Sequence, residues 1–168
     1  MQDASTQLLA CIPRLRRYAR ALIGNRTGAD DLVQDTLERG LQKLALFQQD
    51  SNMRAWLFGI MHNMHVDRIR KPTLMTEELD DNTPMPHVKA TQTQGLEIRD
   101  MEYALRQLPT EQREILLLVA LEEMTYDEVA ASLGIPVGTV MSRLSRAREK
   151  LRAVMEGRTI ISPLKVVK

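Results

Sequence analysis

The chain has 168 residues, a formal net charge of +1, and a composition that is 43% hydrophobic but only 4% aromatic. This length allows one large or two small domains, and the abundance of Leu, Ala, Arg and Glu favours helices with aliphatic cores. A single cysteine excludes an internal disulfide, the N-terminal residues are in the wrong order for a secretion signal, and no apolar run is long enough to span a membrane. We therefore expect a cytoplasmic protein with no direct membrane insertion.

The N-terminal part of the chain is predicted to begin with two helices. Apolar side chains at helical spacing predict the first helix over residues 5–23. Thr27 is predicted to cap the second helix, with Asp30 and Asp31 near the positive end of its dipole. The apolar stripe of this second helix continues to about Phe47, so we expect a long amphipathic helix with one exposed acidic face.

A polar break then separates this helix from a third, which is predicted over residues 54–71. Ser51 or Asn52 is available as its cap. The basic residues at its C-terminal end suit the negative end of the helix dipole. Three helices with short connections indicate one small helical domain over residues 1–71, in which eleven basic residues outnumber seven acidic ones.

Residues 72–95 differ in composition from the rest of the chain. They contain three prolines, few large apolar side chains, and four acidic residues against one lysine. This composition is typical of a flexible acidic linker. Beyond it, two further helices are predicted over residues 96–107 and 110–122, and residues 159–168 form a tail.

The stretch from Thr125 to Met155 predicts a helix-turn-helix. Thr125 and Glu128 have the spacing of a capping box, in which two side chains satisfy free amides at a helix start. Gly134 ends the first helix because glycine adopts a left-handed conformation without steric cost, and Pro136 begins the second. Two short helices around a glycine turn, the second one basic, are typical of this DNA-binding motif.

Basic charge is concentrated on the second of these helices. Residues 136–158 contain six basic and two acidic residues, whereas residues 96–135 contain three basic and nine acidic ones. A solvated amphipathic helix is the alternative, and for an isolated basic helix it would be preferred. The cap, the glycine turn and the proline restart together favour DNA binding. The residues expected to face base edges are Thr139, Ser142, Arg143 and Arg146, and those expected to hold phosphates are Arg148, Lys150 and Arg152.

Several segments resemble those of one known family. They are ADDLVQDTLERGL (29–41), MRAWLFGIMHNMHVDRIRK (53–71) and LRQLPTEQREILLLVALEEMTYDEVAASLGIPVGTVMSRLSRAREKL (105–151). In these segments and their order the chain resembles the bacterial sigma factors of the extracytoplasmic-function type. The resemblance implies an all-α fold of two small helical domains joined by the acidic linker. The implied parts are a sigma2-like domain (1–71), the linker (72–95), a sigma4-like helix-turn-helix domain (96–158) and the tail (159–168).

The same resemblance implies a subunit that joins core RNA polymerase, recognises two promoter elements and helps to melt the promoter. It implies docking on the clamp helices of the largest polymerase subunit through Asp31, Leu32, Gln34, Asp35 and Glu38, with Leu32 and Leu37 as anchors from beneath. The second domain would contact the flap of the second-largest subunit and read the minus-thirty-five element through the helix-turn-helix. The residues implied at the minus-ten element are Phe47, Gln49, Asp50, Ser51, Asn52, Arg54, Trp56, Asn63, Arg68, Arg70 and Lys71.

The linker would thread a basic channel of the polymerase, although an acidic tether explains it equally well. Sigma factors of this type are usually held inactive by an anti-sigma protein, so we expect such a partner. Two alternatives remain: a protein that imitates a sigma factor and sequesters its inhibitor, and a one-domain repressor that uses the helix-turn-helix alone. No cofactor or catalysis is expected, because the sequence contains no phosphate-binding glycine loop and no nucleophile constellation. His62 and His65 have a metal-compatible spacing, but with no third ligand nearby in sequence we expect no metal site.

Overall fold

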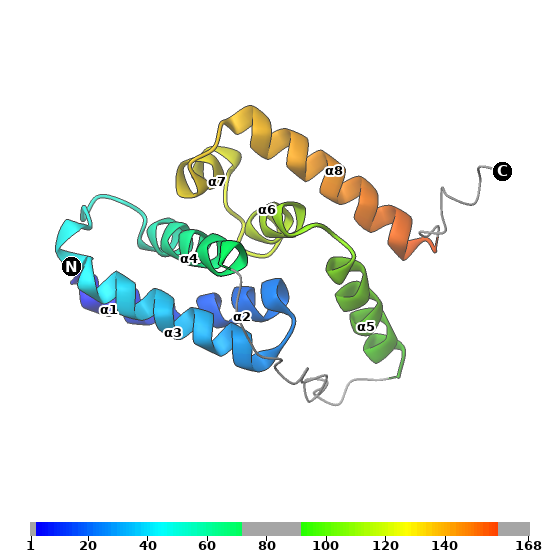
Figure 1. Ribbon diagram of the computed structural model, residues 1–168, viewed down its shortest axis with the longest axis horizontal. Helices are drawn as coiled ribbons and strands as arrows, with labels where there is room; N and C mark the ends of the chain where they lie inside the picture. Colours follow the sequence, from blue (N-terminus) through cyan, green and yellow to red (C-terminus); the bar gives the residue numbers. More distant parts are fainter. Residues whose placement is uncertain (1–2, 72–91, 158–168) are drawn as a thin grey trace.

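The computed structural model describes residues 3–71 and 92–157, with side chains of the second range considered from residue 98 onward. Within these ranges the fold contains α-helices, one short 3-10 turn and no strand, so the predicted all-α class is confirmed (Figure 1). The first domain comprises α1 to α4 and the second comprises α5 to α8. Most of the predicted linker, and the tail, lie outside the described residues.

The first domain contains four helices rather than the three that the sequence predicts. They are α1 (Ala4–Ala10), α2 (Ile12–Ile23), α3 (Arg26–Gln42) and α4 (Met53–Arg70), with the 3-10 turn at Leu44–Leu46. The predicted helix over residues 5–23 is therefore wrong in one respect, because it breaks at Cys11. Pro13, in the first turn of α2, has no amide to donate, and its ring would clash with a continuous helix.

The start and end of α3 also differ from the prediction. Asn25, not Thr27, is the cap: its Oδ1 accepts a 2.7 Å hydrogen bond from the amide of Gly28. Asp30 and Asp31 consequently lie beyond the first turn. The helix ends at Gln42, and the chain reaches Phe47 through the 3-10 turn instead. Of the two caps predicted for α4, Ser51 and Asn52, the structure has Asn52, whose Oδ1 accepts from the amide of Ala55 at 3.3 Å.

The second domain comprises α5 (Gln92–Arg106), α6 (Thr110–Ala120), α7 (Tyr126–Leu133) and α8 (Val137–Met155). Both halves of the predicted capping box are present, since Thr125 Oγ1 accepts from the amide of Glu128 at 3.1 Å and Glu128 Oε2 accepts from the amide of Thr125 at 2.8 Å. Gly134 has a φ of +69°, the left-handed conformation predicted for it. Pro136 occupies the cap position of α8 and not its first turn. The predicted helix-turn-helix is thus α7 and α8.

Aliphatic side chains fill both domains, with few aromatic contacts. In the first domain Tyr18 and Phe58 meet edge to face with ring centroids 4.8 Å apart, among the buried Leu15, Leu22 and Leu57. In the second domain, buried residues of α6, α7 and α8 close the helix-turn-helix from beneath: Ile115, Leu118, Val129, Val140 and Leu144.

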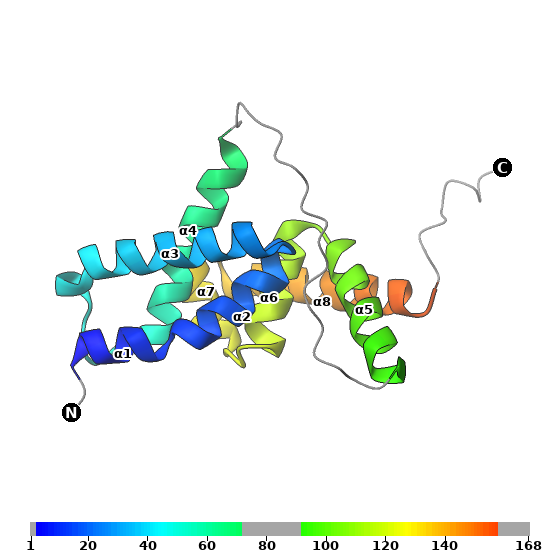
Figure 2. The same ribbon diagram turned by 90° about the horizontal axis from the view of Figure 1, so that it is seen from below.

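The two domains pack directly against each other. α4 lies along α7, and α2 lies against α6 (Figures 1 and 2). The backbones approach closely at Gly59 of α4, where an added Cβ would come within 2.9 Å of the backbone oxygen of Ser132. Arg113 of α6 ties the domains at another point, because its guanidinium donates to the carbonyls of Leu22 and Leu108, each at 2.8 Å. The first domain therefore meets the second through backbone as well as side chains.

Candidate nucleic-acid and polymerase surfaces

The outward face of α8 carries the residues predicted to read the minus-thirty-five element. Val140, Leu144 and Ala147 are buried on the inner side of this helix, and the period of 3.6 residues therefore turns the basic stripe outward. Ser142, Arg146, Arg148, Lys150 and Arg152 are exposed, whereas Thr139 and Arg143 are half-buried.

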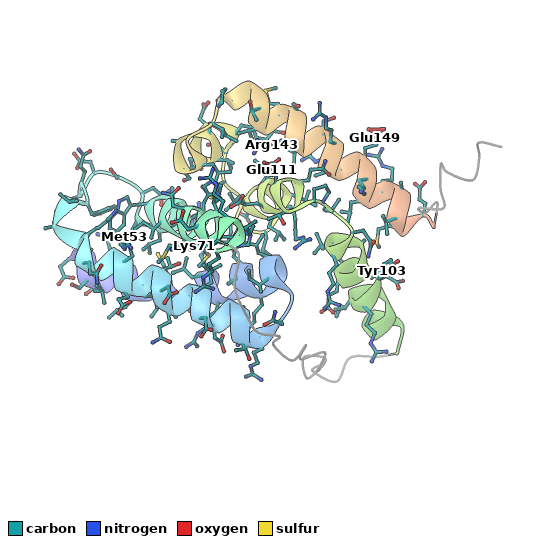
Figure 3. The ribbon with its side chains drawn as sticks, viewed as in Figure 1. Met53, Lys71, Tyr103, Glu111, Arg143 and Glu149 are labelled. Carbon is teal, nitrogen blue, oxygen red and sulfur yellow. The ribbon has the colours of Figure 1, made fainter. Side chains whose placement is uncertain are left out.

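Arg143 is held close to the body of the domain. Its guanidinium lies 3.7 Å from the carboxylate of Glu111 on α6, and Figure 3 shows these two labelled residues side by side, with Glu149 further along the outer side of α8. An exposed ion pair of this length contributes little stability. Arg143 is therefore positioned beside the outward stripe without being locked there.

The acidic residues predicted to dock on polymerase lie along α3. Asp31, Gln34 and Glu38 are exposed, whereas Leu32 is fully buried beneath them. Leu32 thus has the place expected of an anchor and cannot itself touch a partner. Asp35 is half-buried because its carboxylate accepts from Arg68 of α4, an intramolecular ion pair that the sequence did not predict. That pair joins one residue of the predicted polymerase surface to one of the predicted promoter surface.

The loop before α4 divides into an exposed and a buried part. Gln49, Asp50 and Ser51 are exposed. Phe47 is buried and packs against the half-buried Trp56, with ring centroids 5.1 Å apart. The buried Phe47 ring presents no open face for a base in this arrangement, so a base contact by Phe47 stays a prediction that requires the loop to move.

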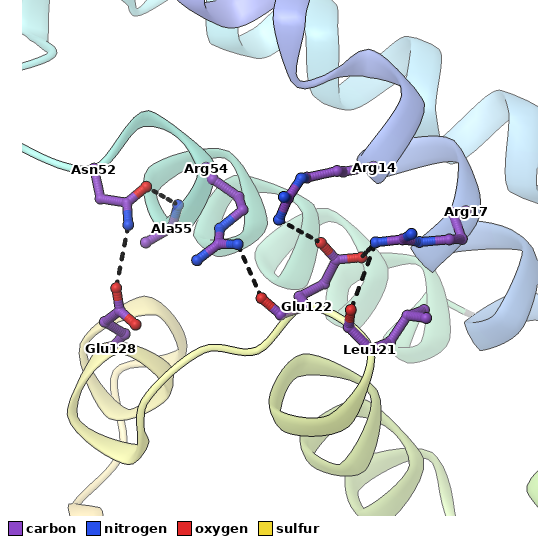
Figure 4. A network of polar contacts seen from close by, with 8 residues as sticks. All are labelled: Arg14, Arg17, Asn52, Arg54, Ala55, Leu121, Glu122 and Glu128. Atoms are coloured by element: carbon purple, nitrogen blue, oxygen red, sulfur yellow. Dashed lines mark hydrogen bonds and ion pairs between the residues drawn. The ribbon is translucent and has the colours of Figure 1, made fainter.

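The start of α4 is hydrogen-bonded to the second domain (Figure 4), with Asn52 exposed and Arg54 half-buried. Asn52 donates through Nδ2 to Glu128 Oε1 at 3.1 Å, and Arg54 donates through Nη1 to the carbonyl of Glu122 at 2.9 Å. The backbone amide of Thr125 is the main cause that lowers the pKa of Glu128, so this carboxylate is ionised and well suited to accept. Two residues predicted at the minus-ten element are therefore occupied within the chain itself.

The far end of α4 is open by comparison. Asn63, Arg70 and Lys71 are exposed, and they lie on the same helix as the occupied residues. The predicted minus-ten residues are thus brought to one helix and its preceding loop, but only part of that surface is accessible.

Other polar groups that sequence reasoning did not assign also lie between the domains. His62 Nδ1 is 2.6 Å from Glu114 Oε2, and Ser132 Oγ donates to the carbonyl of Ala55 at 2.8 Å. The carboxylate of Glu122 lies close to Arg14 and Arg17 of α2. Two features of the sequence hint at these contacts: arginines cluster on one side of α2, and acidic residues cluster around residue 122. Neither cluster indicates which residues it contacts.

Metal-ligating side chains are not assembled in threes within residues 3–71 and 92–157. In the same part of the chain, every helix falls short of the length or hydropathy that a membrane crossing demands.

Comparison with known proteins gives two family matches that together span both domains. The family model described as the Sigma2 domain of PhyR matches residues 8–62, and the one described as Sigma-70, region 4 matches residues 98–151. The ECF RNA polymerase sigma factor EcfG of Rhodopseudomonas palustris is 42% identical over 149 residues, which cover 88% of this chain and 82% of that protein.

Two solved structures of sigma factors are also similar. The sigma factor RpoE from Bartonella quintana, crystallised with the anti-sigma factor NepR, matches with a TM-score of 0.74 at 31% identity, over 100% of both chains. CnrH in complex with the cytosolic domain of CnrY matches with a TM-score of 0.68 at 30% identity, over 93% of this chain and 89% of that one. The similarity therefore extends over both domains and not over the helix-turn-helix alone.

Proposed function

Because the chain belongs to the extracytoplasmic-function family of RNA polymerase sigma factors, we propose that it brings core polymerase to promoters through the surfaces described above. The first domain docks through the acidic face of α3 and holds the minus-ten strand through the loop and helix from Phe47 to Lys71. The second domain reads the minus-thirty-five element with α8. Its contribution is binding without catalysis, and its place of action is the cytoplasm.

One observation carries this proposal: a single chain presents an exposed acidic face on α3 and an exposed basic face on α8, each supported by a buried apolar stripe. The acidic face suits a basic protein partner, and the basic face suits phosphates and base edges in a major groove. A one-domain repressor would leave the first of these faces without a role. The predicted domain limits (1–71, 72–95, 96–158 and 159–168) belong to this proposal.

Control by an anti-sigma protein is the second part of the proposal. RpoE and CnrH, both similar over almost their whole length, were solved in complex with NepR and CnrY. While the domains are packed, the surfaces between them are in contact with each other. An anti-sigma protein that recognises this packed arrangement would therefore bind the surfaces that remain exposed on the two domains.

The experiment is co-purification with bacterial core RNA polymerase. We expect stable binding by the full chain and its loss in the Asp31→Arg, Glu38→Arg variant, which reverses two exposed charges without touching the Asp35–Arg68 pair. The Asp100→Arg, Glu149→Arg variant makes the same change in net charge on exposed positions of the second domain and serves as the matched control.

Two results would contradict the proposal. Absence of binding by folded, inhibitor-free wild-type protein would rule out a sigma factor. The first-domain match to the Sigma2 domain of PhyR would then favour the protein that imitates a sigma factor and sequesters its inhibitor. Equal loss of binding in both double variants would remove the acidic face of α3 from the docking surface.

A further inference from the structure

The turn between α6 and α7, residues 121–125, is inserted against the first domain (Figure 4). Its contacts form a row across two helices of that domain. From α2, Arg17 Nη2 lies 3.1 Å from Glu122 Oε2, and Arg14 Nη1 lies 3.6 Å from Glu122 Oε1. From α4, Arg54 donates to the backbone carbonyl of Glu122 at 2.9 Å. Three guanidinium groups thus converge on one residue of the second domain.

The carboxylate at the centre of this row is fully buried. The side chain of Glu122 is 0% exposed, whereas those of Arg14 and Arg17 remain 49% and 53% exposed. An ionised carboxylate without compensation is costly to bury, so its stability at this place depends on the arginines. The dependence is one-sided, because the arginines remain hydrated along one side and need no carboxylate to stay charged.

This row is continuous with the surface predicted to hold the minus-ten strand. Arg54 belongs to both, and Asn52, two residues before it, is hydrogen-bonded to Glu128 of the second domain. Guanidinium groups bind phosphate and carboxylate with the same two-pronged geometry, so one oxyanion can replace the other. Single-stranded DNA is held by grooves of positive charge that follow its backbone.

We propose that Arg14, Arg17 and Arg54 form a phosphate-binding row for the single strand of promoter DNA, and that Glu122 occupies it while the domains are packed. This inference rests on the proposed function and assigns two further DNA-binding residues, Arg14 and Arg17. The turn and the strand are competitors for one surface, so the packed chain binds a strand weakly and the open chain binds it well.

The test measures binding of the full chain to a fluorescein-labelled single-stranded oligonucleotide of mixed sequence by fluorescence anisotropy. Glu122→Gln keeps the shape of the side chain and removes the charge that holds the turn. We expect about tenfold tighter binding, equivalent to a rise in the competent fraction from about a tenth to nearly all. Glu123→Gln removes the same charge one residue later, where the side chain is exposed, and should leave the affinity unchanged.

The arginine variants distinguish two effects: opening of the domains, and loss of the proposed phosphate-binding residues. Arg14→Ala, Arg17→Ala also releases the turn, yet it should gain no affinity because it removes the row itself. Combined with Glu122→Gln it should abolish the tenfold gain and lower the salt dependence of log affinity by about 1.4, two phosphates at about 0.7 each. Arg16→Ala removes one exposed positive charge from the same helix and controls for a general loss of charge.

Small-angle X-ray scattering and circular dichroism on the same samples report domain separation and folding. An open, folded Glu122→Gln variant with unchanged affinity would overturn the inference, as would a variant that stays closed. Equal gains for the glutamine and the arginine variants would place the strand elsewhere, and an equal gain for duplex DNA would make the row a general polyanion patch. If Glu122→Gln still co-purifies with core polymerase in these cases, the proposed function stands and only this inference fails.

Discussion

The two predicted DNA-binding surfaces of this chain differ in accessibility. Among the residues that the structure describes, the outward face of α8 is exposed, and Arg143 at its edge is drawn towards Glu111. The start of α4, by contrast, is hydrogen-bonded to α7 and to the turn before it, although Asn52 itself stays exposed. Both surfaces carry basic residues at suitable spacing, so composition does not distinguish them. What distinguishes them is which polar groups another part of the same chain can reach.

The physical reason lies in how each surface is built. α8 uses one buried stripe for packing and leaves the opposite face without any structural duty. The start of α4 is a helix end, where amides and a capping side chain seek partners, and α7 offers a second helix end with an ionised carboxylate. A helix end, with its free polar groups, therefore forms hydrogen bonds to another part of the same chain more readily than the side of a long helix does.

The Gly59→Ala substitution is expected to have the largest effect, because it should separate the domains and free the start of α4. Its Cβ would lie 2.9 Å from the backbone oxygen of Ser132, which cannot rotate away. Overpacking of this kind costs about 1–3 kcal/mol. Because the clash is with backbone, we expect the loss of domain-packing free energy to lie near the upper end of that range. We expect a larger radius of gyration by small-angle scattering, with the first domain still folded because alanine favours α4.

Gly138→Ala is the control for this prediction. Gly138 is also helical, with no atom within 4 Å of an added Cβ among the residues that the structure describes. The gain in helix propensity, about 1 kcal/mol, is therefore matched between the two variants. An unchanged radius of gyration in Gly59→Ala would mean that the domains tolerate the extra methyl and are less closely packed than the structure has them.

A prediction of intermediate size concerns the open surface. Arg146→Ala should weaken promoter binding by about 2 kcal/mol and relax the preference at one base pair, if this exposed arginine reads a guanine. Binding to a set of single-base promoter variants, measured for the polymerase complex, is the test. A uniform loss across every variant would reassign Arg146 to a phosphate. Because α8 is uncovered, the loss should be the same in a Gly59→Ala background.

The smallest expected effect is a pH dependence of the covered surface. His65 of α4 is 7% exposed beside the domain contact. Its burial lowers its pKa, Glu114 of α6 opposes that shift, and His62, Arg113 and Arg68 add to it. The unfolded chain therefore binds a proton more readily than the folded one. The free energy of unfolding should fall as pH drops below about 6.5, by less than about 1.4 kcal/mol per pH unit for one group.

Chemical denaturation at about pH 7.5 and about pH 5.5 brackets this window. The His65→Gln variant cannot titrate, so its stability should differ less between the two conditions than that of the wild type. A slope that survives in this variant would assign the effect to another group.

Local signals allowed much of the fold to be predicted from the sequence. The helix-turn-helix follows from Thr125, Glu128 and Gly134, each of which acts within one turn of its own position. The errors were also local. The apolar stripe of residues 5–23 continues past Pro13 although the helix breaks before it, and Asn25 rather than Thr27 is the N-cap of α3. Apolar periodicity records which face is buried but not where the backbone stops being helical.

The contacts between the domains could not be predicted, because residues more than fifty positions apart make them. Nothing in the sequence indicates that Glu122 and Arg14 are partners. Within the first domain the same holds for Asp35, whose sequence position suggests a free docking residue although Arg68 lies beside it. Gly59 is a further hint of the contact between the domains. A glycine inside a helix is destabilising unless something approaches closely, and here the backbone of α7 does.

The pair formed by Asn52 and Glu128 bears on how quickly the chain can change state. Asn52 caps α4 with Oδ1 and uses Nδ2 for Glu128, while Glu128 caps α7 with Oε2 and uses Oε1 for Asn52. At this pair, parting the domains breaks only the Asn52–Glu128 hydrogen bond and leaves both helix ends capped. The rate of opening is set by rigid-body motion, on the order of microseconds to milliseconds, without any wait for a helix to unravel. When the domains pack again, both helix ends are already capped. Repeated opening and closing at this pair therefore requires no refolding of either helix.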